Sequence, residues 1–83
     1  MPLIVSLDIE TTGLDPESDA IIEIGMVKFS EKRVEAEYSQ LVNPRRPIPG
    51  PITNLTNISN SMVLNQPYLA DVLPDVIDFV GDA

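Results

Sequence analysis

The sequence lacks cysteine, histidine and tryptophan, and only 5% of its residues are aromatic. Without cysteine no disulfide can support the fold, which is consistent with a reducing compartment. Without histidine no imidazole is present to pair with an acidic residue. The apolar runs all fall far short of the ~20 residues that cross a bilayer, and no basic segment marks a signal peptide at the N-terminus. We therefore predict a cytoplasmic chain with no membrane contact.

Positive charge is also scarce, because five Lys and Arg residues face 13 Asp and Glu, for a net charge of −8. This balance argues against a protein that grips a long nucleic acid by counterion release. It does not exclude binding of one strand end through metal ions, which reverse the local sign of the field. Four cations form two pairs, Lys32-Arg33 and Arg45-Arg46. We interpret them as solvated turns in preference to a rim that follows phosphates.

The length of 83 residues and the 43% share of hydrophobic residues allow one small globular domain. A domain of this size buries only about 60–65% of the surface that its unfolded chain exposes. The core is therefore expected to be thin.

Short apolar runs rich in isoleucine and valine predict three strands, over residues 3–10, 20–29 and 34–42. The polar stretch 30–33 favours an antiparallel hairpin between the second and third strands. Gly25, in the middle of the second strand, suggests a bulge or a close backbone approach.

The second half of the chain carries helical signals. Residues 43–51 hold four prolines and one glycine, which predicts a stiff connector. A short helical turn is expected over 52–56, ended by Asn57 in left-handed geometry. Residues 69–80 form the clearest helix, with Leu69, Val72, Leu73, Val76 and Val80 on one apolar stripe.

Pro74 does not fit the interior of that helix, because it removes one backbone hydrogen bond and clashes with the preceding turn. Either the helix begins late, so that Pro74 lies in its first turn, or the helix kinks there. Gly81 is expected to end the helix.

The first strand ends in two acids, Asp8 and Glu10, separated by one residue. Side chains two apart on a strand face the same way, so both carboxylates project together. Like charges so close repel each other unless a cation lies between them. Carboxylate oxygens suit Mg²⁺ or Mn²⁺. On spacing alone, an equally good alternative is a solvated Asp8 with Glu10 already in the loop.

A longer stretch favours the metal site. SLDIETTGLDP, followed by IIEIGMVKF, resembles the first motif of the DEDD, or DnaQ-like, 3′–5′ exonucleases. The resemblance continues through LVNPRRPIP, the stretch after the family's third strand, and ITNLTNIS, which is similar to its I-T-x-L-T-G-I segment. ADVLPDVIDFVGDA resembles the helix before the second motif. The resemblance implies an α/β, ribonuclease H-like fold: the three-stranded antiparallel start of a mixed sheet with one or two helices, truncated.

The resemblance also implies roles for individual residues. Asp8 and Glu10 would be two of four acidic ligands for the two Mg²⁺ or Mn²⁺ ions of a complete site. The metal ions would assist hydrolysis of a phosphodiester at the 3′ end of a single-stranded nucleic acid. The expected partners of such a domain are a DNA polymerase or a helicase.

Further family positions lie beside the acids. Thr11, Thr12 and Gly13 would shape the turn that receives the terminal nucleotide, partly through backbone N–H groups. Thr56 falls where the family often contacts the substrate end. Glu23 also matches a family glutamate, either as a structural hydrogen-bonding group or as a strand-edge acid in water.

The chain departs from the family in what it lacks, namely two more aspartates and a histidine or tyrosine base. Tyr38 and Tyr68 match neither family position, and the helix acids Asp71, Asp75, Asp78 and Asp82 are expected on a solvated face. Residues 1–83 are thus predicted to form the N-terminal part of one exonuclease domain, with negligible activity alone. The first strand would lie at an exposed edge and promote self-association, swapping or partial unfolding.

Two alternatives belong to other classes. The first is a non-catalytic docking module that keeps this fold to bind a polymerase or a helicase. The second is a phosphotransfer enzyme with D-x-D at a strand end, which fits poorly because position 10 is Glu and Thr-Thr-Gly follows. A sugar-kinase or actin-like ATPase fails for want of a glycine at position 10.

Overall fold

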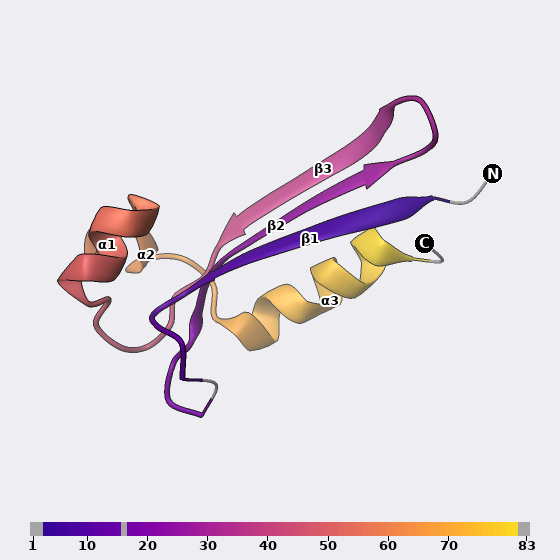
Figure 1. Cartoon of the computed structure of the whole chain (residues 1–83). Coiled ribbons are helices and arrows are strands. Elements are labelled where there is room, and N and C mark those ends of the chain that lie inside the picture. Colours follow the sequence, from indigo (N-terminus) through magenta and orange to yellow (C-terminus); the bar gives the residue numbers. More distant parts are fainter. Residues whose placement is uncertain (1–2, 16, 82–83) are drawn as a thin grey trace.

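The computed structural model describes residues 3–15 and 17–81, which form a three-stranded sheet and three helices (Figure 1). The strands come first along the chain and the helices follow. Asp82, predicted to lie on the polar face of the last helix, is outside the described residues.

The sheet consists of β1 (Ile4–Thr11), β2 (Ile21–Phe29) and β3 (Val34–Leu41), paired antiparallel in the order β1-β2-β3. All three predicted strands are confirmed, and their ends differ from the prediction by at most one residue. The central strand, β2, alternates between buried and half-buried residues. Ile22, Ile24 and Met26 are buried. Because side chains alternate between the two faces of a strand, these three residues share one apolar face of β2, which is turned toward the helices.

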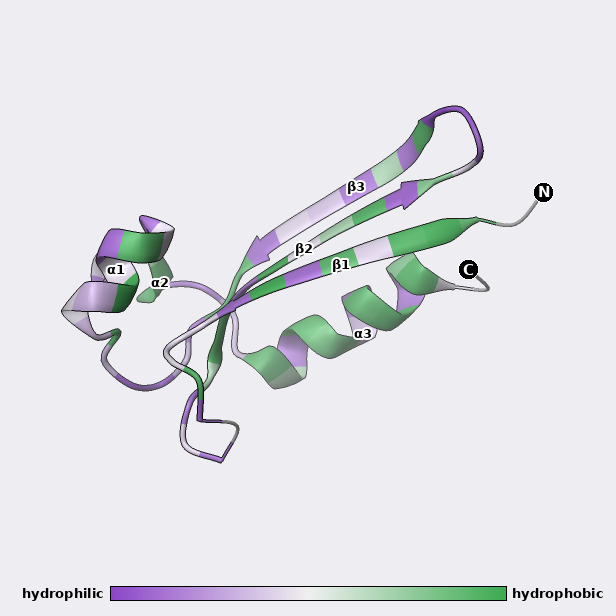
Figure 2. Cartoon of the chain, in the orientation of Figure 1, coloured by the Kyte–Doolittle hydropathy of each residue, from purple (hydrophilic) through white to green (hydrophobic). Residues whose placement is uncertain are grey.

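The long helix α3 (Leu69–Val80) covers that face of the sheet, as Figure 1 shows. Val72 of the helix packs in a buried cluster with Ile24, Met26 and Val42. Figure 2 shows hydrophobic residues along both α3 and the N-terminal half of β1. The helix spans the predicted residues and ends at Gly81, whose N–H donates to the carbonyl of Ile77.

Two short helices, α1 (Gly50–Thr56) and α2 (Asn60–Val63), lie beyond the end of the sheet where β1 ends (Figure 1). The second of them was not predicted. They enclose a second buried cluster formed by Ile22, Ile48, Ile58 and Val63. Asn57 ends α1 with the expected left-handed backbone, at φ 63°. Ile22 belongs to β2, Leu41 at the end of β3 packs against the cluster, and Ile48 lies in the connector 43–51. The cluster therefore holds this connector against the end of the sheet.

Three local expectations were wrong. Gly25 keeps regular pairing with Asp8 and Ser39, and the register shifts lie elsewhere, between Glu10 and Thr11 and between Lys28 and Phe29. A Cβ at Gly25 would lie 3.8 Å from the Asp8 carbonyl, which is an ordinary contact. The α3 helix does not begin late, because Pro74 lies in its interior. Leu73 is exposed, and Phe79 packs against the core in its place.

Within the described residues, β1 has a strand partner on one side only. Leu7 is 61% exposed and Ile9 is 44% exposed, although both point to the apolar face of the sheet. Ile77 of α3 is exposed as well. The first strand therefore presents an apolar edge, as predicted. In the part of the chain that the structure describes, no helix has the length and apolar character needed to span a membrane.

Candidate metal and nucleotide site

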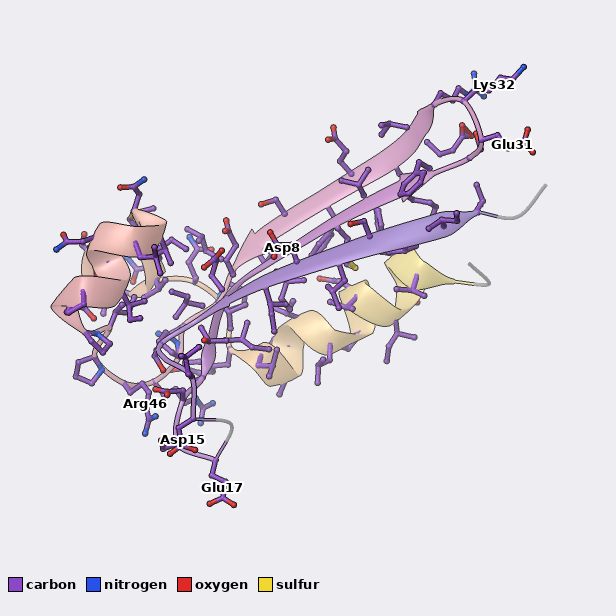
Figure 3. All side chains as sticks on the ribbon, in the orientation of Figure 1. Asp8, Asp15, Glu17, Glu31, Lys32 and Arg46 are labelled. Atoms are coloured by element: carbon purple, nitrogen blue, oxygen red, sulfur yellow. The ribbon has the colours of Figure 1, made fainter. Side chains whose placement is uncertain are left out.

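Asp8 and Glu10 project from β1 on the face of the sheet that α3 leaves open. Their cross-strand partners are Gly25 and Glu23 respectively. Figure 3 shows the Asp8 carboxylate standing off the sheet on the side away from α3. Glu10 lies within β1, which continues to Thr11, so the alternative that places it in the loop is wrong. The two carboxylates face the same way, as their spacing predicts.

A hollow lies beside Asp8, because the residue opposite it on β2 has no side chain. Its lining includes Ser6, Asp8, Gly25, Glu37 and Ser39, contributed by all three strands. Gly25 leaves space on this face without any unusual backbone geometry. The hollow is bordered by oxygen-bearing side chains, which are the ligand type that hard divalent cations prefer.

The second acid has a like-charged neighbour, because Glu10 pairs directly with Glu23 across the strands. Directly opposed like charges destabilise a sheet unless a cation offsets them. Glu23 is half-buried on the central strand, which contradicts its interpretation as a strand-edge acid. Within residues 3–15 and 17–81, no three acidic residues gather closely enough to hold a metal ion. The described residues therefore bring two carboxylates together, and not the complete cage that a metal ion needs.

The turn after Glu10 is held by a network centred on Thr12, which is only 2% exposed. The Thr12 hydroxyl donates to Oδ1 of Asp19 at 2.8 Å and accepts the Ala20 N–H at 2.9 Å. The other oxygen of Asp19 accepts the Asp15 N–H at 2.9 Å. The hydroxyl of Thr12 thus bonds within the protein, to Asp19 and Ala20. Its place in a turn that receives a terminal nucleotide stays a prediction.

Asp15 belongs to the same turn and is fully exposed. Two hydrogen bonds lower the pKa of Asp15, the larger effect coming from the backbone N–H of Glu17 and the smaller from the side chain of Ser18. Its charged form is therefore favoured on the rim of the turn.

Thr11 and Gly13 lie at the edge of a different hollow, on the α3 side of the turn. That hollow is larger and mainly apolar, and Leu14, Arg45 and Tyr68 also line it. The Thr11 hydroxyl donates to the carbonyl of Gly13. The structure thus brings Asp8 and Glu10 together on one face and places Thr11 and Gly13 at the end of the same strand.

Thr56 is the last residue of α1, and its hydroxyl is used locally. It donates to the Ile52 carbonyl at 2.8 Å and accepts the Ile58 N–H at 3.2 Å. These bonds fix the side chain at the end of α1, and they do not bring it to Asp8 or Glu10. A role at the substrate end therefore stays a prediction.

Four of the five cations lie in two turns, and the fifth, Lys28, lies in β2 with its Nζ 4.9 Å from the centroid of the Phe79 ring. Arg33 pairs with Glu35 at 2.7 Å, and this hydrogen bond raises the pKa of the guanidinium. The guanidinium of Arg45 lies 3.7 Å from the centroid of the Tyr68 ring. Arg45 also has a left-handed backbone, with φ 59°, supported by the bond from its N–H to Oδ1 of Asn43.

The fold, the paired acids and the turn after them define a nuclease lineage. A family model described as "Exonuclease" matches residues 5–83, and the chain belongs to that family. "DNA polymerase III PolC-type" of Clostridium perfringens is 44% identical over 79 residues, which cover 95% of this chain and 6% of that protein. "DNA polymerase III subunit epsilon" of Aquifex aeolicus is 38% identical over 78 residues, covering 94% of this chain and 39% of that protein.

Solved structures support the same assignment of fold. Exonuclease X in complex with 5′ overhanging duplex DNA superposes with a TM-score of 0.77 at 32% identity, over 87% of this chain and 42% of that one. A full-length 3′-exonuclease superposes with a TM-score of 0.82 at 27% identity, over 93% of this chain and 28% of that one. The ribonuclease H-like fold predicted from the resemblance is confirmed. The chain spans less than half the length of each of these relatives.

Two contributors to the site were not predicted from the sequence. Asp19 was not singled out, although an aspartate before a strand is a common partner for backbone and hydroxyl groups of a turn. Gly25 was noticed for the wrong reason, because its position opposite Asp8 depends on the strand register. Only the register reveals that the missing side chain leaves a hollow beside the acid.

Proposed function

We propose that this chain is the N-terminal part of a 3′–5′ exonuclease domain and that Asp8 and Glu10 are metal ligands of its active site. The observation that carries the proposal is the projection of both carboxylates from β1 on the open face of the sheet. Among the described residues, no protein group donates a hydrogen bond to the carboxylate of Asp8 or Glu10, and none forms an ion pair with it. Both are thus available to a ligand.

The donor set fits Mg²⁺ or Mn²⁺, because two carboxylates beside other oxygen-bearing side chains suit a hard cation. Exonucleases of this family generally use divalent metals. Two ions in a complete site supply an activated water and offset charge on the scissile phosphate. Asp8 and Glu10 would hold these ions, and the like-charged pair of Glu10 and Glu23 adds to the attraction for a cation.

The substrate end would meet the turn after β1. Thr12 and Asp19 fix the turn internally, which leaves Thr11, Gly13 and the backbone around them to receive a terminal nucleotide. Thr56, at the end of α1, is the proposed contact from the other side. Since the net charge is −8, an approaching phosphate is repelled until cations occupy the site.

The described residues alone are an incomplete catalyst. They provide two ligands and no group of three acids. Tyr38 lies on the α3 face, with its ring centroid 5.8 Å from that of Phe79. It is therefore on the opposite face from Asp8 and Glu10 and cannot deprotonate a water beside them. We therefore expect negligible hydrolysis by residues 1–83 alone. The chain covers 6% of one relative and 39% of the other, which supports the proposal that it is one part of a larger unit.

The relatives are named as components of DNA polymerase III, and one neighbour holds duplex DNA with a 5′ overhang. We propose by analogy that the substrate is the 3′ end of a single strand and that a DNA polymerase is the partner; a helicase is the other candidate. A cytoplasmic location stays a prediction.

The test is a Mn²⁺ titration followed by paramagnetic broadening of amide signals in NMR spectra. We expect the amides around positions 8–10 to broaden first, and the effect to be lost in Asp8→Ala and in Glu10→Gln. Asp71→Ala and Glu31→Gln are matched controls, because both residues are exposed acids on other elements. Unchanged broadening in Asp8→Ala and Glu10→Gln would contradict the proposal.

A second candidate is the non-catalytic docking module, for which the exposed apolar side chains of β1 offer a binding surface. A docking module has no need for a metal at Asp8. The same titration separates the two functions, because specific broadening at β1 supports the nuclease and its absence supports the docking module.

A further inference from the structure

We propose that Thr12 and Asp19 form a positioning pair that keeps Glu10 on the open face of the sheet, where it binds metal. The inference rests on the proposed function for Glu10 as a ligand. Thr12 is the one buried polar residue in the described part of the chain. Burying a hydroxyl is unfavourable unless it is hydrogen-bonded. Its two bonds, to Asp19 and from Ala20, meet that requirement and join the two ends of the turn.

Backbone bonds reinforce this closure. The Thr12 N–H donates to the Ala20 carbonyl at 2.8 Å, and the Asp19 N–H donates to the Asp15 carbonyl at 2.8 Å. Asp19 therefore contributes both of its carboxylate oxygens and its own N–H to one turn. A charged acceptor makes stronger hydrogen bonds than a neutral one, so Asp19 is the strongest single support of the turn.

The pair acts on Glu10 because the strand register changes immediately after it. Glu10 pairs with Glu23, but Thr11 pairs with Ile21, so Ile22 is the extra residue of a bulge. A bulge can aim a side chain, but it needs its neighbours to hold its position. If the bulge moved by one residue along β1, the side chain of Glu10 would turn to the opposite face of the sheet. The bonds of Thr12 to Ala20 and Asp19 fix the register on the far side of this bulge.

Gly13 completes the arrangement. A Cβ built on it would collide with the carboxylate of Asp19. No positive φ is involved, so the glycine is required for space and not for backbone freedom. The carboxylate of Asp19 occupies the place where a side chain at position 13 would be. Gly13 thus serves the Thr12–Asp19 pair in addition to its proposed place beside the nucleotide.

The experiment compares Thr12→Val and Asp19→Ala with Thr12→Ser, in the full chain. Valine keeps the shape of threonine without the hydroxyl, and serine restores the hydroxyl. The core variant Ile48→Val is the matched control for a general loss of stability, because Ile48 is buried in the cluster with α1 and α2. For each variant, the Mn²⁺ affinity at β1, the melting temperature and the NOE contact between Glu10 and Glu23 are measured.

We expect Thr12→Val and Asp19→Ala to weaken Mn²⁺ binding about tenfold, the lower end of the loss that follows when residues orienting a metal ligand are removed. The contact between Glu10 and Glu23 should weaken with it, while Thr12→Ser retains both. Ile48→Val should lower the melting temperature only. If Thr12→Val and Asp19→Ala melt earlier but keep the Mn²⁺ affinity and the cross-strand contact, the pair is merely structural and the inference is wrong. Failure of the proposed function would be seen separately, as Mn²⁺ binding unaffected by Asp8→Ala.

Discussion

Tyr38 has a buried hydroxyl without a hydrogen-bond partner among the described residues. Burial, followed by the negative charge of Asp75, raises the pKa of Tyr38 above its ordinary value. The neutral phenol is thus favoured in the folded chain. Its contribution to stability is present below the unfolded pKa, near ~10, and is lost as the pH rises through the higher folded pKa.

We predict that Tyr38→Phe leaves stability at neutral pH unchanged or raises it by up to ~1 kcal/mol, because it removes an unsatisfied polar atom and keeps the ring on Phe79. It should also reduce the loss of stability above pH ~10. Denaturant unfolding at neutral and alkaline pH measures both effects. Tyr68→Phe is the control, since Tyr68 is exposed and leaves Tyr38 in place. A clear loss of stability in Tyr38→Phe at neutral pH would show that the hydroxyl has a partner.

At the scale of elements, α3 contains the least expected feature, the interior Pro74. The helix tolerates it because packing of Val72, Val76 and Phe79 on the sheet outweighs the lost backbone bond. Pro74 itself is exposed, so its removal leaves no cavity.

We predict that Pro74→Ala stabilises the chain by about 1–3 kcal/mol, because it restores an N–H donor and removes a clash. The gain is reduced by the greater freedom of the unfolded chain. Thermal unfolding and amide exchange in α3 measure it. Pro51→Ala is the control, and it should bring no gain, because Pro51 lies in the first turn of α1, where proline fits. An unchanged or lower melting temperature in Pro74→Ala would contradict this account.

The same elements show what sequence alone could predict. Strand and helix patterns depend on residues close together in the sequence, so the bounds of the three strands and of α3 were predicted within one residue. The spacing of Asp8 and Glu10 likewise fixed their common face. The bulge after Glu10 and the role of Asp19 were not predictable, since both depend on which residues of β2 meet β1. Leu73 was misplaced because its burial depends on which side of α3 packs on the sheet.

At the scale of the whole molecule, the thin core leaves apolar surface beside the edge of β1 that has no strand partner among the described residues. Leu7 and Ile9 on β1, with Ile77 on α3, are exposed on the same side of the sheet. An unpaired edge strand with apolar side chains is a template for pairing with another chain. The net charge of −8 opposes such pairing at low salt. Salt screens this repulsion, so association should grow with ionic strength.

We predict that the chain associates through β1 in a concentration-dependent way and that Leu7→Lys keeps it monomeric. Leu7 is 61% exposed in the middle of the edge strand, where a lysine opposes pairing without removing a buried side chain. Leu55→Lys is the matched control, because Leu55 is 79% exposed but lies on α1, away from the edge. Size-exclusion chromatography with light scattering, at two salt concentrations, measures the mass of each variant. A monomer at every concentration, or equal association of the chain and Leu7→Lys, would show that this edge is not used, because only contacts through β1 place Leu7 between the two copies.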